Sequence, residues 1–78
     1  MKTIIDSNSR VFQIIDSFDR SYFCNLQDIQ LVCNELKDSF KIYHFWNSKP
    51  AKVSKSYLKE LFLNNDINVN KSFYSNML

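Results

Sequence analysis

Apolar residues near the start of the chain repeat with the spacing of an amphipathic helix. They are Val11, Phe12, Ile14, Ile15 and Phe18. A run of cap-forming residues at positions 6–9 precedes them, and the i, i+3, i+4, i+7 spacing predicts a first helix over about residues 10–19. The alternative is a hairpin that pairs residues 3–5 with residues 11–15, although no Asn-Gly turn separates the two segments.

A second apolar stripe follows Asn25, which is a good N-cap residue. Its members recur at helical spacing and are Ile29, Val32, Cys33, Leu36 and Phe40. Asp28 stands three residues after the cap, where an acidic side chain meets the positive end of the helix dipole. We therefore predict a second helix over about residues 26–38.

Residues 40–46 form the segment richest in aromatic and β-branched side chains. Aromatic and apolar side chains at every second position of this segment fit a strand. A helical stripe through Ile42, Phe45 and Trp46 is the alternative. We favour a short aromatic-rich strand. Because a lone strand leaves its backbone unpaired, this strand needs a partner strand near the N-terminus, near the C-terminus or in another chain.

The last third of the chain predicts one further helix. Residues 47–52 are interpreted as a loop around the single proline, and Ser54 is then the predicted N-cap, with Val53 just outside it as a hydrophobic staple. The apolar residues of this helix are Tyr57, Leu58, Leu61 and Phe62. The helix is expected to end near residues 64–65, and a short terminal helix over residues 71–78 is a further candidate.

The 78 residues include one proline and no glycine. Tight hairpin turns need positive φ angles, which glycine adopts most easily, so this composition favours helices over a multi-hairpin sheet. Asparagine is then expected to form the left-handed turns. The candidates are Asn34, Asn47, Asn64, Asn65 and Asn68. These signals predict a single mostly α domain over residues 1–78 with about three helices and one strand, and an α+β fold is the alternative.

The reactive side chains form no recognisable catalytic or metal-binding motif. Cys24 and Cys33 are nine positions apart, and the chain has neither a C-x-x-C nor an H-E-x-x-H motif. His44 is the only histidine, so a thiol–imidazole pair needs one of these cysteines beside it in space. We therefore predict a protein that is not an enzyme, that binds no metal or cofactor, and whose thiols are buried.

Lysines and aromatic residues are interleaved in the second half of the chain. Residues 37–78 carry seven lysines against three acids, whereas residues 1–36 carry three basic residues against five acids. Basic residues mixed with aromatic rings suit phosphate contact and base stacking, which makes this stretch a candidate nucleic-acid-binding site. Its residues are Lys49, Lys52, Lys55 and Lys59. The stretch contains no arginine, which argues against sequence-specific readout.

The segment from Leu26 to Pro50 resembles the helix-turn-helix of phage repressors, with Ile29 on a first helix and residues 42–46 on a second. The resemblance covers about a third of the chain and implies a small DNA-binding transcriptional regulator. The sequence departs from the family pattern at Gln30, where a small residue normally lets the two helices approach.

The aromatic residues exceed what one small core is expected to bury. Those predicted to anchor a protein partner are Tyr43, Phe45, Trp46 and Tyr57. We therefore expect a small regulatory or inhibitory protein, of a kind typical of phages and mobile elements, that masks the surface of an acidic protein partner. A homodimer is an alternative, and nucleic-acid binding is the rival function. A cytoplasmic, non-membrane location is expected, because there is no leader and no apolar run of about 18 residues.

Overall fold

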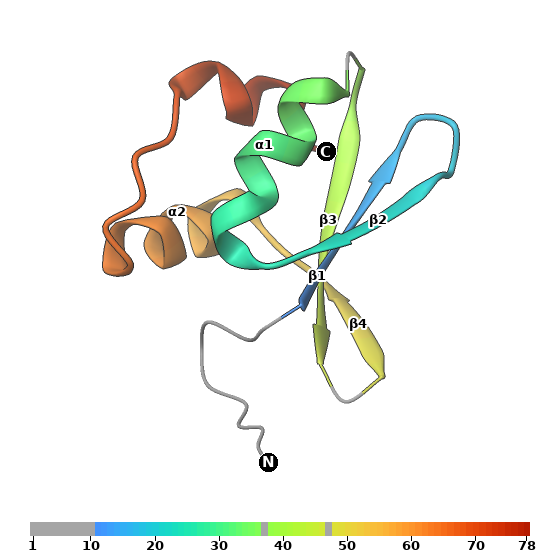
Figure 1. The fold of residues 1–78 in the computed structure, drawn as a ribbon, viewed down its shortest axis with the longest axis horizontal. Helices are drawn as coiled ribbons and strands as arrows, with labels where there is room; N and C mark the ends of the chain where they lie inside the picture. Colours follow the sequence, from blue (N-terminus) through green and yellow to red (C-terminus); the bar gives the residue numbers. More distant parts are fainter. Residues whose placement is uncertain (1–10, 37, 47) are drawn as a thin grey trace.

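The computed structural model describes residues 11–36, 38–46 and 48–78. It contains a four-stranded antiparallel sheet in the order β2-β1-β3-β4, with α1, α2 and the C-terminal segment together on one side of it (Figure 1). The strands are β1 (Val11–Asp16), β2 (Ser21–Cys24), β3 (Phe40–Trp46) and β4 (Lys49–Lys52). The helices are the 3-10 helix η2 (Leu26–Asp28), α1 (Ile29–Glu35), α2 (Lys55–Asn64) and the 3-10 helix η3 (Lys71–Asn76). The prediction of a mostly α domain is therefore wrong, and the chain forms a small α+β domain.

The segment predicted as the first helix is the central strand β1. Phe12 and Ile14 are fully buried, whereas Gln13 and Ile15, which alternate with them along the strand, are only partly buried, as the two-residue period of a strand requires. Phe12 lies opposite Cys24 in β2 on one side and opposite His44 in β3 on the other. Hydrogen bonds to two neighbouring strands thus override the local helical pattern. Residues 3–5, which the hairpin alternative needs, lie outside the described residues.

The β1–β2 hairpin turns without glycine. Asp19 adopts φ 63° there, and the Asp16 carboxylate accepts hydrogen bonds from the amides of Phe18 at 2.8 Å and Arg20 at 2.9 Å. Ser48 and Asp66 also have positive φ angles, of 64° and 56°. The expectation that asparagine takes these positions is wrong for Asn34, Asn64, Asn65 and Asn68, and Asn47 lies outside the described residues. Aspartate tolerates the left-handed region because its short polar side chain bonds to the local backbone.

The predicted strand over residues 40–46 is confirmed as β3, and its partner near the N-terminus is β1. The predicted loop over residues 47–52 is wrong, because β4 occupies most of it. Pro50 lies in this edge strand opposite Phe45. Proline has no backbone N–H to donate. An edge strand tolerates it because the N–H groups on the outer side of such a strand have no neighbouring strand to bond.

Two predicted helix caps are confirmed. Asn25 Oδ1 accepts a hydrogen bond from the Asp28 amide at 3.0 Å, and Ser54 Oγ accepts one from the Tyr57 amide at 3.2 Å. The second helix begins as a 3-10 turn and ends at Glu35, earlier than predicted. The end of α2 at Asn64 agrees with prediction.

The core lies between the sheet and the helices. Its buried residues are Phe12, Ile14, Leu26, Ile29, Cys33, Phe40, Ile42, Val53, Leu58, Phe62, Phe73 and Met77. The C-terminal end completes it, because Met77 bridges to Phe40 and the Leu78 amide donates to the Phe40 carbonyl at 2.8 Å. The predicted terminal helix is present as η3, in 3-10 form.

Candidate functional site

The side of the sheet opposite the helices carries three aromatic residues that the buried core leaves out, namely Phe23, Tyr43 and Phe45. We call it the open face. Because side chains alternate along each strand, the register assigns its members. They are Val11, Gln13, Ile15, Ser21, Phe23, Lys41, Tyr43, Phe45, Pro50 and Lys52. Val11 is 39% exposed and Phe23 is 57% exposed, so large apolar side chains reach solvent here.

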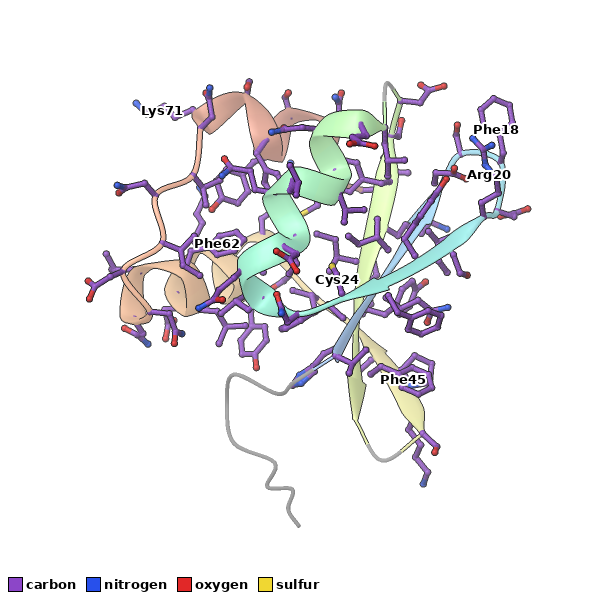
Figure 2. The ribbon with its side chains drawn as sticks, in the orientation of Figure 1. Phe18, Arg20, Cys24, Phe45, Phe62 and Lys71 are labelled. Atoms are coloured by element: carbon purple, nitrogen blue, oxygen red, sulfur yellow. The ribbon has the colours of Figure 1, made fainter. Side chains whose placement is uncertain are left out.

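The strand register arranges the open face in rows. Across β2, β1, β3 and β4, one row follows the order Phe23, Gln13, Tyr43 and Lys52. The next row places Phe45 between Val11 and Pro50. The Phe23 and Phe45 rings meet edge to face with their centroids 5.6 Å apart, and Phe45 lies on the side of the sheet away from the helices (Figure 2). The rings of β2 and β3 therefore form one aromatic patch that extends across β1, the strand between them.

The charged members of the open face are lysines. Lys52 ends one row beside Tyr43, and Lys41 ends another beside Ile15. Both lysines are exposed, and no member of the open face is acidic. The face thus has an apolar, aromatic centre and a cationic rim.

The structure brings together only some of the predicted anchors. Tyr43 and Phe45 share the open face. Tyr57 is 41% exposed on α2, on the helical side of the sheet, so it does not join them. Trp46 ends β3 opposite Lys49, and its side chain lies outside the described residues. Phe23 also lies on the open face but is not among the predicted anchors, because a four-residue strand is too short to give a clear alternating pattern.

The predicted nucleic-acid site is divided between two elements. Lys49 and Lys52 lie on β4 but on opposite faces of it, and Lys55 and Lys59 lie on α2. The Lys59 ammonium group lies over the Tyr74 ring, 5.0 Å from its centroid. Residues 42–46 belong to β3, so the second helix implied by the helix-turn-helix resemblance is a strand. The four lysines do not form one surface with the aromatic patch.

Both thiols lie on the covered side of the sheet and are poor nucleophiles. Burial, with a smaller contribution from Asp28, raises the pKa of Cys24 to about 11. Burial raises the pKa of Cys33 to about 12, and the neighbouring Cys24 adds to this shift. Burial disfavours the charged form of a thiol, so little thiolate exists near neutral pH. His44 stacks on Phe12 with ring centroids 4.9 Å apart.

These pKa shifts predict slow alkylation. Relative to a thiol with the ordinary pKa of 9.0, the thiolate fraction near pH 7.5 falls about 100-fold for Cys24 and about 1,000-fold for Cys33. Iodoacetamide labelling of the native protein, followed by peptide mass analysis, should modify Cys24 before Cys33. Both should react quickly in denaturant. Rapid native labelling of Cys33 would contradict the burial described here.

Three further searches, for a metal-binding cluster, for a membrane-spanning helix and for similar known proteins, identified no feature that assigns a function. In the described part of the chain, no group of three or more His, Cys, Asp or Glu side chains is placed to hold a metal ion. The same residues include no helix with the length and apolar character needed to cross a membrane. Comparison of the chain with protein-family models, with curated proteins and with solved structures found no match.

Proposed function

We propose that this protein is a non-enzymatic binding module that covers an acidic surface of a partner protein with its open face. One observation carries the proposal: Phe23, Tyr43 and Phe45 form an aromatic patch on the open face, and the charged groups around this patch are the lysines Lys41 and Lys52. The effect on the partner would be steric masking.

The composition of the open face matches that of a protein interface. Interface centres are enriched in aromatic residues, which supply large contact areas at a small cost in side-chain entropy, and interface rims are polar. A hydrogen bond from Gln13 Nε2 to Ser21 Oγ at 3.2 Å orders the polar groups of this face. Lysines at the rim attract a negatively charged partner and accelerate its association. We place this function in the cytoplasm, where the two free cysteines would stay reduced.

Nucleic-acid binding is the rival function. Aromatic rings and lysines on one sheet also suit single-stranded nucleic acid, whose bases stack on such rings. The open face carries two lysines, and the other lysines of the basic stretch lie on the far face of β4 or on α2. We favour the protein partner because few phosphate contacts are available beside the rings.

The test is quantitative binding to a purified partner. Candidates are captured on the immobilised protein from cells that produce it, purified, and titrated against the wild type and the Phe45→Asp and Leu63→Asp variants. We expect Phe45→Asp to weaken binding about 100-fold, because it places a charge at the centre of the interface. Leu63→Asp is the matched control: Leu63 is 76% exposed on α2, and its change should leave affinity within about threefold.

Three results would overturn the proposal. A partner that binds Phe45→Asp as tightly as the wild type does not use the open face. Self-association that Phe45→Asp abolishes in sedimentation experiments would assign the face to a second copy of the chain. Binding of a labelled single-stranded oligonucleotide that depends on Phe45 and falls steeply between about 50 and 200 mM salt would assign it to nucleic acid.

A further inference from the structure

A second concave surface lies between the β1–β2 hairpin and α1. It is a pocket of about 610 Å³, within the range of roughly 300–1,000 Å³ typical of ligand sites. Asp16 and Tyr22, which line it, belong to the side of the sheet that faces the helices. The pocket therefore opens on the helical side, away from the open face, and a ligand there does not compete with the proposed partner.

Two large apolar side chains at the pocket are left in solvent. Phe18 is 70% exposed at the tip of the hairpin, and Leu31 is 64% exposed on α1. Leu31 and Glu35 are four residues apart on the helix and so share its face toward the pocket. The partly buried Leu36 continues the apolar lining. The pocket thus offers apolar walls that an inserted side chain would cover.

The hairpin holds its side of the pocket in a defined shape. Arg20 Nε donates to Asp16 Oδ2 at 2.9 Å, and the guanidinium group lies over the Phe18 ring, 5.1 Å from its centroid. The Tyr22 hydroxyl donates to the same carboxylate at 3.3 Å. Phe18 and Arg20 lie side by side at the tip of the hairpin (Figure 2). Such a frame limits the ordering cost of binding.

The charge of the pocket selects a cationic ligand. Arg20 is paired with Asp16, so these two charges balance. Glu35 and Asp38 also line the pocket, and both are exposed. The Ser17 hydroxyl donates to Asp38 Oδ2 at 3.2 Å, which leaves the negative charge in place. The described lining therefore carries a net negative charge around an apolar centre.

We infer that this pocket binds an amphipathic segment of another protein, with a bulky apolar side chain between Phe18 and Leu31 and lysine or arginine against Glu35 and Asp38. This mode of recognition places an apolar anchor in a groove and uses charge to set orientation. The site is distinct from the open face and needs a basic ligand, whereas the open face needs an acidic one.

The test uses a fluorescently labelled leucine–lysine amphipathic helical peptide of about 14 residues, with a leucine–glutamate counterpart as the charge control. Anisotropy should show binding of the first peptide and at least about tenfold weaker binding of the second. Phe18→Ser and Leu31→Ser should each weaken the leucine–lysine peptide about tenfold. Glu35→Gln combined with Asp38→Asn should weaken it about three- to tenfold, and less at high salt.

Two surface variants locate the site. Leu63→Ser removes a leucine from α2 that is more exposed than Leu31, and Phe45→Asp alters the open face, so both should bind the peptide within about twofold of the wild type. No binding at about 1 mM peptide, equal binding of both peptides, or an undiminished affinity in Leu31→Ser would overturn the inference. Phe45→Asp alters the open face and leaves the pocket intact. Peptide binding by this variant therefore tests the pocket independently of the open-face proposal.

Discussion

Replacing Phe12 by alanine is expected to lower the free energy of unfolding by about 3–5 kcal/mol. Phe12 is fully buried in the central strand, and its ring stacks on His44 with centroids 4.9 Å apart. Alanine leaves a cavity where β1 and β3 meet, and neither strand can collapse into it without breaking the ladder between them. For a chain of this size, the loss is a large fraction of a total stability of about 4–12 kcal/mol.

Urea denaturation followed by circular dichroism measures this effect. Phe12→Leu, which keeps most of the volume, should cost much less, and Phe18→Ala should change stability by no more than about 0.5 kcal/mol because Phe18 is 70% exposed. An unfolding midpoint for Phe12→Ala close to that of the wild type would show that residue 12 is not in the core.

Replacing Asp16 is expected to be the most damaging polar substitution among the described residues. Its carboxylate accepts four hydrogen bonds, from the Phe18 and Arg20 amides, Arg20 Nε and the Tyr22 hydroxyl. Asp16→Ala leaves these donors without their acceptor at a turn that has no glycine to relieve strain. Asp16→Asn should lose less, because its amide oxygen still accepts a hydrogen bond from a turn amide.

The same residue makes stability depend on pH. Burial by itself raises the pKa of Asp16, but the hydrogen bonds from the Arg20 and Phe18 amides and the Arg20 guanidinium outweigh it, so the pKa lies below its ordinary value of 3.8. The folded state then binds its proton less readily than the unfolded state does. The contribution to stability is complete above the unfolded pKa and is lost as pH falls through the folded pKa.

Unfolding measured from about pH 6 to about pH 2 tests this sign. The wild type should lose stability more steeply than Asp16→Asn as pH falls through the carboxyl range. Equal slopes for the two proteins would place the acid sensitivity in other carboxylates.

Helix caps and one strand were predictable because their signals are local. Asn25 and Ser54 cap helices through hydrogen bonds to amides three residues away, and this geometry needs no other part of the chain. The aromatic and β-branched composition of residues 40–46 likewise favoured β3, which the structure confirms. In these segments, local preference and tertiary pairing agree.

The segment 11–16 shows where local pattern is insufficient. Six residues fit a helical stripe and a strand almost equally well, since Phe12 and Ile14 satisfy a period of two while Val11, Phe12 and Ile15 satisfy a helical period. Pairing with β3, more than twenty residues away, decides between them. The turn after β1 misled the prediction in the same way, because Asp16 and Asp19 replace the glycine that hairpins usually need.

The sequence by itself determined two helix caps, one aromatic strand, an interleaved set of lysines and aromatic residues, and the lack of a recognisable catalytic motif. Only the tertiary structure decided which of these residues share a surface. The register of β1 with β2 and β3 sets Phe23 beside Phe45 and separates Tyr57 from both. The approach of α1 to the hairpin makes Leu31 and Phe18 walls of the same pocket. These residues are far apart in the sequence and become neighbours only when the strands pair. The favourable energy of this pairing appears only once the whole sheet has formed, so no local sequence pattern reveals it.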